Sequence, residues 1–148
     1  MRYSDISLNG IDSKGQHKNY KLNDFKGEKV VVYFYPKDET SLCTKEACDF
    51  RDKLQTIQQN GQQKIRIVGV SPDSIESHKH FHEKENLNFV LLSDPDMKLA
   101  KAMGVDEPFR GLIARTTFLI DENGNIVKEW ERVKVDGHAE DVMKNMMQ

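Results

Sequence analysis

Runs of β-branched and aromatic residues alternate along the chain with segments whose apolar residues recur at helical spacing. The first run, residues 30–35, is apolar at every position, which is typical of a strand buried on both faces of a sheet. The next segment, residues 43–59, carries apolar residues on one helical face: Ala47, Phe50, Leu54 and Ile57. The pattern predicts a strand that leads through a short loop into a helix.

The alternation continues to the end of the chain. Further strands are predicted over residues 65–70 and 89–92, and further helices over residues 74–85, 94–103 and the last dozen residues. An Asn-Gly step between residues 116–120 and 126–130 predicts a hairpin of two antiparallel strands. Turn-forming residues in the segment 7–15 predict another hairpin near the N-terminus.

The order of these elements indicates the fold class. A β-α-β unit requires its strands to pair in parallel, whereas a hairpin adds antiparallel strands. We therefore predict an α/β, thioredoxin-like fold: a mixed central sheet flanked by helices, with an N-terminal β-hairpin. The 148 residues contain no internal repeat and no linker, so we expect a single domain over residues 1–148. A fold alone does not identify a function.

Charge and hydropathy narrow the classes of function. Lys plus Arg number 22 and Asp plus Glu number 24, for a net charge of −2. This balance argues against a nucleic-acid-binding protein, which carries a basic excess. No segment approaches the roughly 20 apolar residues of a membrane span, and the first residues lack the apolar core of a signal peptide. We expect a cytoplasmic protein without nucleic-acid or membrane partners.

The two cysteines are Cys43 and Cys48. In a reducing cytosol such a pair is more often catalytic, redox-active or metal-binding than a structural disulfide. Cys43 falls where the first buried strand gives way to a helix N-terminus, whose free N–H groups and dipole favour a reactive thiolate. The pair does not form the C-x-x-C motif of thioredoxin-like disulfide exchangers, which disfavours that function.

The spacing of the cysteines limits how they can react with each other. On a regular helix, five residues correspond to a rise of about 7.5 Å, and the two side chains point about 140° apart. A disulfide requires Cα atoms within roughly 7 Å and converging Cβ atoms. A bond between Cys43 and Cys48 therefore requires the first turns of the helix to unwind.

Residues 34–48 read Phe-Tyr-Pro-Lys-Asp-Glu-Thr-Ser-Leu-Cys-Thr-Lys-Glu-Ala-Cys. This segment resembles the active-site segment of peroxiredoxins, most closely the bacterioferritin-comigratory (PrxQ) group. Pro36, Thr40 and Cys43 meet the family pattern Pro-x-x-x-Thr-x-x-Cys. Residues 24–27, 68–74, 91–95 and 115–121 also resemble that group. The group commonly has proline after the threonine, where this chain has Ser41; the change removes a fixed φ but no reacting group.

The resemblance implies a thiol-dependent peroxidase that reduces hydrogen peroxide and organic hydroperoxides. Cys43 would be the peroxidatic cysteine and become a sulfenic acid, and Cys48 would resolve it as an intramolecular disulfide. Thr40 would orient the peroxide, Arg115 would stabilise the thiolate and the leaving oxygen, and Pro36 would shape the substrate pocket. A thioredoxin-type dithiol would reduce the disulfide. The resemblance further implies a monomer that needs no metal or cofactor.

Three other functions remain open from the residues. Cys48 could be structural, which would leave a one-cysteine peroxidase, or Cys43 could serve as a non-catalytic redox switch. His78, His80 and His82 raise the third, a Cys/His metal-binding protein. On a helix His78 and His82 share a face whereas His80 points away, and a structural zinc site requires four ligands. We therefore expect no metal site there.

Overall fold

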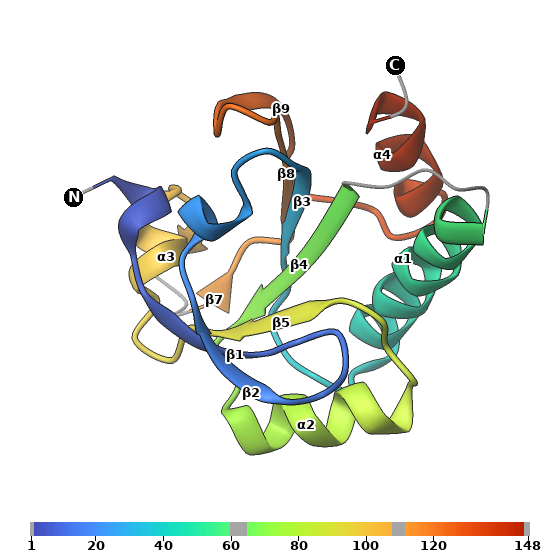
Figure 1. The fold of residues 1–148 in the computed structure, drawn as a ribbon. Helices are drawn as coiled ribbons and strands as arrows, with labels where there is room; N and C mark the ends of the chain where they lie inside the picture. The colour runs from blue at the N-terminus through green and yellow to red at the C-terminus, as the bar shows by residue number, and fades with distance from the viewer. Residues whose placement is uncertain (1, 60–64, 108–111, 147–148) are drawn as a thin grey trace.

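A mixed sheet of seven strands forms the centre of the protein (Figure 1). The computed structural model describes residues 2–59, 65–107 and 112–146. The strands are β1 (Leu8–Ile11), β2 (His17–Tyr20), β3 (Lys29–Phe34), β4 (Ile65–Ser71), β5 (Val90–Ser93), β8 (Thr116–Ile120) and β9 (Ile126–Trp130), in the spatial order β2-β1-β5-β4-β3-β8-β9. β4 pairs in parallel with β3 and β5, and the other neighbours are antiparallel. The predicted mixed sheet and N-terminal hairpin are confirmed.

Helices cover both faces of this sheet. They are α1 (Ser41–Gln59), α2 (Ile75–Lys84), α3 (Lys98–Ala102) and α4 (His138–Met146). α1 and α4 lie together on one side of the sheet, and α3 lies on the other (Figure 1). α1 connects β3 to β4 and α2 connects β4 to β5, so each parallel pair is joined through a helix, as predicted.

Some elements differ from the sequence prediction. α3 covers only Lys98–Ala102 of the helix predicted over residues 94–103, because Met97 adopts a left-handed φ of 57° that is incompatible with a helix. Two 3₁₀ helices (Tyr3–Asp5 and Leu22–Phe25) and a short pair, β6 (Asp106–Glu107) with β7 (Leu112–Ile113), were not predicted. These short elements carry too few residues to show a periodic pattern.

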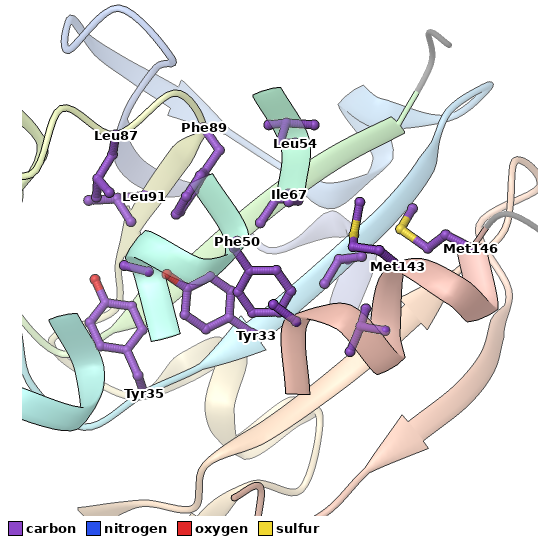
Figure 2. Packing of buried hydrophobic residues seen from close by; sticks show 14 of the residues in the cluster. Tyr33, Tyr35, Phe50, Leu54, Ile67, Leu87, Phe89, Leu91, Met143 and Met146 are labelled. Carbon is purple, nitrogen blue, oxygen red and sulfur yellow. The ribbon is translucent and has the colours of Figure 1, made fainter. Parts of the chain in front are cut away.

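Strand β3 divides the core into two clusters. Val31, Tyr33 and the following Tyr35 face α1 and α4, whereas Val32 and Phe34 face the side of α3. The Tyr33 ring stacks on Phe50 of α1 with 4.8 Å between ring centroids, and Met143 and Met146 of α4 close the same cluster (Figure 2). Burial of both faces explains why this strand is apolar throughout. Because α1 packs on this cluster, its first turn is held next to the end of β3.

The helix predicted for the last dozen residues is present as α4, with Val142 and Met146 buried on its inner face. Within the described parts of the chain, no helix is both long and apolar enough to cross a membrane.

We expect Phe50→Ala to lower the free energy of unfolding by about 3–5 kcal/mol, because it opens a cavity between α1 and β3. The measurement is equilibrium unfolding in urea. Gln55→Ala, on the exposed face of the same helix, is the control and should change stability by less than about 0.5 kcal/mol. Equal losses in the two variants would contradict the packing described above.

Candidate active site

The first turn of α1 begins beside the carboxyl end of the central strand β3. The backbone N–H of Thr44 donates to the carbonyl of Thr40 at 2.8 Å, so Thr40 is the N-cap residue and Ser41 the first helical residue. The helix therefore starts two residues before the predicted start, and Cys43 is its third residue. Proline is well tolerated at the first helical position. Ser41 thus occupies a position where a proline would also fit.

Cys43 is in contact with the guanidinium of Arg115, which lies just before β8. Arg115 Nη2 donates to Cys43 Sγ at 3.3 Å, across 72 positions of the sequence. The thiol is 1% exposed. The antiparallel pair Phe34↔Thr116 explains this contact, because it brings the residue before β8 beside the loop after β3. The sequence-predicted pair of Cys43 and Arg115 is therefore brought together.

Glu46 completes this group and was not among the predicted site residues. Its Oε1 accepts from Arg115 Nη1 at 2.7 Å, and its side chain is only 1% exposed. Burial raises the pKa of Glu46 to about 7, even though the charge of Arg115 acts to lower it. Its Oε2 is buried and has no hydrogen-bond partner among the described residues. Arg115 is thus shared between the thiol and a carboxyl group that titrates near neutral pH.

The sequence contained a signal for Glu46. It lies three residues after Cys43, next to Ala47, and therefore on the helical face that the apolar pattern predicts to be buried. A charged residue on such a face is rarely buried without a partner of opposite charge. The partner, however, comes from a distant strand and could not be identified from the helix alone.

Thr40 and Pro36 belong to the loop between β3 and α1. The Thr40 hydroxyl donates to the carbonyl of Lys37 at 3.0 Å, and its side chain is exposed. A hydroxyl that donates one hydrogen bond still has oxygen lone pairs with which to accept another. Pro36 is half-buried in the same loop. The structure thus places Thr40 one helical turn from Cys43, with its oxygen able to accept from a ligand.

The side chain of Cys48 points away from Cys43, Arg115 and Glu46. Its thiol donates to Glu85 Oε1, just after α2, at 3.5 Å, and Arg51 Nη1 donates to the Glu85 carbonyl at 2.6 Å. Burial, reinforced by the hydrogen bond to Glu85, raises the pKa of Cys48, whereas the nearby charge of Arg51 acts to lower it. Both cysteines are free. Cys43 contacts Arg115 and Cys48 contacts Glu85, as expected for side chains that diverge on an intact helix.

The three histidines of α2 have separate environments. His78 is fully buried and bonded to Asp38, whereas His80 is exposed and pairs with Glu39. His82 is also buried, on the same face of α2 as His78. The predicted divergence of His80 from the other two rings is confirmed.

Comparisons with known proteins identify the family. The model of the AhpC/TSA family matches residues 2–129. Peroxiredoxin Bcp of Bacillus subtilis (strain 168) is 44% identical over 144 residues, which cover 92% of this chain and 89% of that protein. The chain is a peroxiredoxin of the Bcp/PrxQ group. A putative peroxiredoxin bcp of Coxiella burnetii, 46% identical over 129 residues, covers 82% of this chain and matches over 83% of its own length.

Solved structures confirm the thioredoxin-like fold of this peroxiredoxin. A cysteine-to-serine variant of Xanthomonas campestris peroxiredoxin Q superposes with a TM-score of 0.86 and 34% identity, covering 98% of this chain and 91% of that one. The bacterioferritin comigratory protein of the same organism, described for its alkyl peroxide reduction activity, gives a TM-score of 0.84 and 36% identity, with coverage of 98% and 92%. The enzyme is therefore a thiol peroxidase, which disfavours the non-catalytic switch and the metal-binding protein.

We expect Arg115→Met to slow the reaction of Cys43 with hydrogen peroxide by about 10²–10³-fold, the loss typical when one preorganised donor is removed. The measurement is the second-order rate constant of thiol oxidation in stopped flow. Arg66→Met is the control, because Arg66 pairs with Glu28 and lies beside Val30, toward the other end of β3. A rate unchanged in the Arg115 variant would rule out a role for the contact with Cys43.

We expect the thiol of Cys48 to react slowly with iodoacetamide at neutral pH, because a raised pKa leaves less thiolate. In a Cys43→Ser background, the rate should rise with pH around a midpoint above that of an ordinary cysteine. Glu85→Gln removes a negative charge beside the thiol and should move this midpoint to lower pH. The same midpoint with and without Glu85 would show that the carboxylate does not influence Cys48.

Proposed function

We propose that this peroxiredoxin works with two cysteines and forms a disulfide between Cys43 and Cys48 in each catalytic cycle. The observation that carries the proposal is the 3.3 Å contact between Arg115 Nη2 and Cys43 Sγ. A permanent positive charge beside a buried thiol stabilises the thiolate, which is the nucleophilic form. Cys48 is bonded instead to the acidic Glu85, and burial keeps its pKa raised despite the nearby charge of Arg51. We therefore assign Cys43 to the first reaction.

In the first step, the thiolate of Cys43 attacks the terminal oxygen of a hydroperoxide. The O–O bond breaks, Cys43 becomes a sulfenic acid, and the leaving oxygen takes up a proton to form water or an alcohol. Arg115 donates to the developing negative charge on the oxygens. The hydroxyl of Thr40 orients the peroxide by accepting its O–H, and Pro36 limits access of water to the thiolate.

In the second step, the sulfur of Cys48 attacks the sulfenic sulfur of Cys43. The S–S bond forms, and the hydroxyl of the sulfenic acid leaves as water with the proton of Cys48. The two side chains lie on different sides of α1, so the first turns of the helix must unwind for the sulfurs to meet. The contacts of Cys43 with Arg115 and of Cys48 with Glu85 are broken in this step.

In the third step, a thioredoxin-type dithiol reduces the disulfide by exchange and restores both thiols. A supply of dithiol requires a reducing compartment, so we propose that the enzyme works in the cytoplasm.

The same donors serve hydrogen peroxide and organic hydroperoxides, and the alkyl peroxide activity of the Xanthomonas campestris relative supports organic hydroperoxides as substrates. We propose that residues 1–148 form one catalytic domain, active as a monomer without metal or cofactor.

A one-cysteine mechanism is the second candidate. The observation that favours it is the contact of Cys48 with Glu85, which holds the thiol away from Cys43. In that mechanism an external thiol would attack the sulfenic acid directly, and Cys48 would only pack against the end of α2.

We expect Cys43→Ser to abolish peroxide turnover with a thioredoxin reductant system and Cys48→Ser to reduce it strongly. The physical reason is that Cys43 supplies the only thiolate beside Arg115, whereas Cys48 is needed only after the first oxidation. Steady-state turnover is measured on the wild type and both variants side by side.

The matched control is a single turnover without reductant. Cys48→Ser should consume one equivalent of peroxide at the wild-type rate and accumulate the sulfenic acid, trapped by dimedone. Full turnover in Cys48→Ser would establish the one-cysteine mechanism, and an inactive wild type with every dithiol and peroxide would overturn the proposal.

A further inference from the structure

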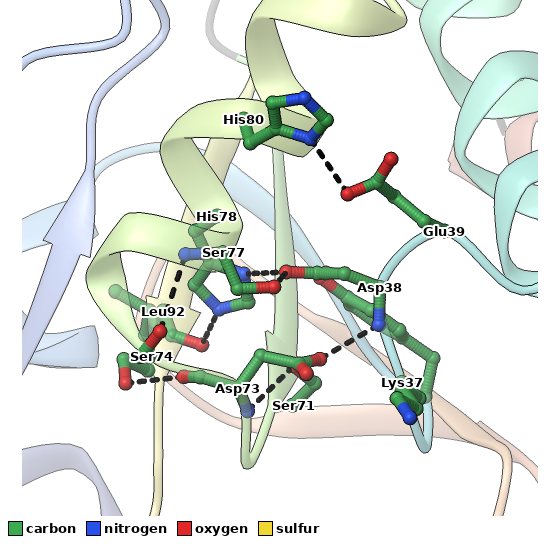
Figure 3. Close-up of polar contacts among 12 residues, drawn as sticks. Lys37, Asp38, Glu39, Ser71, Asp73, Ser74, Ser77, His78, His80 and Leu92 are labelled. Atoms are coloured by element: carbon green, nitrogen blue, oxygen red, sulfur yellow. Dashed lines mark hydrogen bonds and ion pairs between the residues drawn. The ribbon is translucent and has the colours of Figure 1, made fainter.

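A buried polar network lies directly behind the loop that carries Thr40. Asp38 Oδ2 is 2.7 Å from His78 Nδ1, and the two side chains are 1% and 0% exposed. Asp38 also accepts from the hydroxyls of Tyr35 at 2.6 Å and Ser77 at 2.8 Å. Figure 3 shows Ser77 and His78 of α2 pointing at this one carboxyl group from the same side. None of these groups takes part in the reaction proposed above.

Hydrogen-bond roles in the network can be assigned by elimination. His78 Nε2 is 2.9 Å from the carbonyl oxygen of Leu92 in β5, and a carbonyl only accepts, so Nε2 carries a proton. The contact between Nδ1 and Asp38 then holds one further proton, shared by an imidazole and a carboxyl group. A neutral amide at position 38 could supply that proton from its NH₂ group and accept from Tyr35 with its oxygen.

The network attaches the loop to α2 and to the segment that follows β4. The backbone N–H of Asp38 donates to Asp73 Oδ2 at 2.7 Å, after β4, while the side chain bonds to α2. Glu39, the next residue, has a left-handed φ of 62°, a conformation that is strained for a residue with a side chain. Such strain persists only where the surroundings hold the backbone in place. Thr40 follows immediately, so its place at the start of α1 depends on how firmly Asp38 is held.

A metal site does not explain the network. Asp38, Asp73 and His78 offer ligand atoms within 4.8 Å of one another. The two atoms of the Asp38–His78 contact already face each other at 2.7 Å, and Asp73 Oδ2 accepts from Asp38 N and from the Ser71 hydroxyl at 2.6 Å. These atoms satisfy one another as hydrogen-bond donors and acceptors.

We propose that the Asp38–His78 pair is a positioning element of the peroxide site. It holds the loop of residues 36–40 so that Thr40 keeps its position at the N-cap of α1. The pair acts through Thr40 and touches neither the peroxide nor Cys43. The proposal rests on the assignment of Cys43 as the peroxidatic cysteine and is independent of how the sulfenic acid is resolved.

The test compares two reactions of Cys43 in a Cys48→Ser background. Oxidation by hydrogen peroxide needs both the thiolate and an oriented peroxide, whereas alkylation by iodoacetamide needs only the thiolate. His78→Phe keeps the size of the ring but leaves the Asp38 carboxyl group buried without its main partner, which should release the loop. We expect peroxide oxidation to slow by about 10–100-fold, the cost of a small displacement of a reacting group, while alkylation stays near the parent rate.

Three further variants keep the test decisive. Asp38→Asn can keep the contacts with His78 and Tyr35, while the Ser77 hydroxyl turns from donor to acceptor, and should retain nearly the parent peroxide rate. Tyr35→Phe removes a single hydrogen-bond donor and keeps the packing, so it should give a smaller, equally selective loss of peroxide oxidation. This variant replaces His78→Phe in the test if His78→Phe does not fold. His80→Phe is the matched control, because His80 lies on the same helix but its pair with Glu39 is exposed and contributes little.

The outcomes separate the hypotheses. A selective loss of peroxide oxidation in His78→Phe or Tyr35→Phe, with Asp38→Asn close to the parent, supports the positioning role. Equal losses of oxidation and alkylation, or no loss in either variant, would overturn it. If the parent protein itself does not react with peroxide while its Cys43 is alkylated normally, the proposed function fails instead.

Discussion

In the mechanism that we propose, the chemistry of this enzyme depends on the contact between Arg115 and Cys43. It joins the first turn of α1 to a residue 72 positions away, and it exists only because β3 and β8 are paired in the register Phe34↔Thr116. The pairing of these strands therefore determines the geometry of the site, because a shift of one residue in the register would move the guanidinium away from the thiol. Glu46 shares the same cation, so the electrostatics of the site involve three groups rather than two.

In the proposed two-cysteine mechanism, helix α1 has to satisfy two opposing requirements. Phe50 and Leu54 are buried against the sheet and hold the middle of the helix firmly. Cys43 and Cys48 lie before them in the chain, and their side chains face different neighbours, so disulfide formation requires the first turns to open. The first turns of the helix bury only the small side chains of Cys43 and Ala47 together with Glu46, whereas its large apolar side chains come later, so we expect its start to open more easily than its remaining turns.

The buried polar network supports the same region from the other side of the loop. Asp38 is held by His78 of α2 and by Asp73 in the loop after β4, and His78 is in turn bonded to Leu92 of β5. Such a fully bonded network is rigid, because any displacement leaves a buried polar group without a partner. The proposed mechanism thus combines a firmly held loop before Cys43 with a helix whose first turns unwind after oxidation.

Much of this architecture could be predicted from local patterns. The strands at the centre of the sheet, α1, α2 and the hairpin of β8 with β9 follow from apolar runs, helical spacing and an Asn-Gly turn. The start of α1 was placed two residues too late because the apolar pattern that predicted the helix begins at Ala47 and does not mark its first turn. α3 was predicted too long because the left-handed conformation of Met97 leaves no trace in an apolar pattern.

The sequence by itself determined the fold class, the place of Cys43 at a helix start and the family resemblance, since each depends on residues that are close along the chain. Only the tertiary structure decided that Glu46 shares Arg115 with Cys43, that Cys48 is bonded to Glu85, and that Asp38 pairs with His78. The physical reason is that the state of a buried ionisable group depends on its partners in space. Those partners come from elements that only the packing of the sheet and helices brings together.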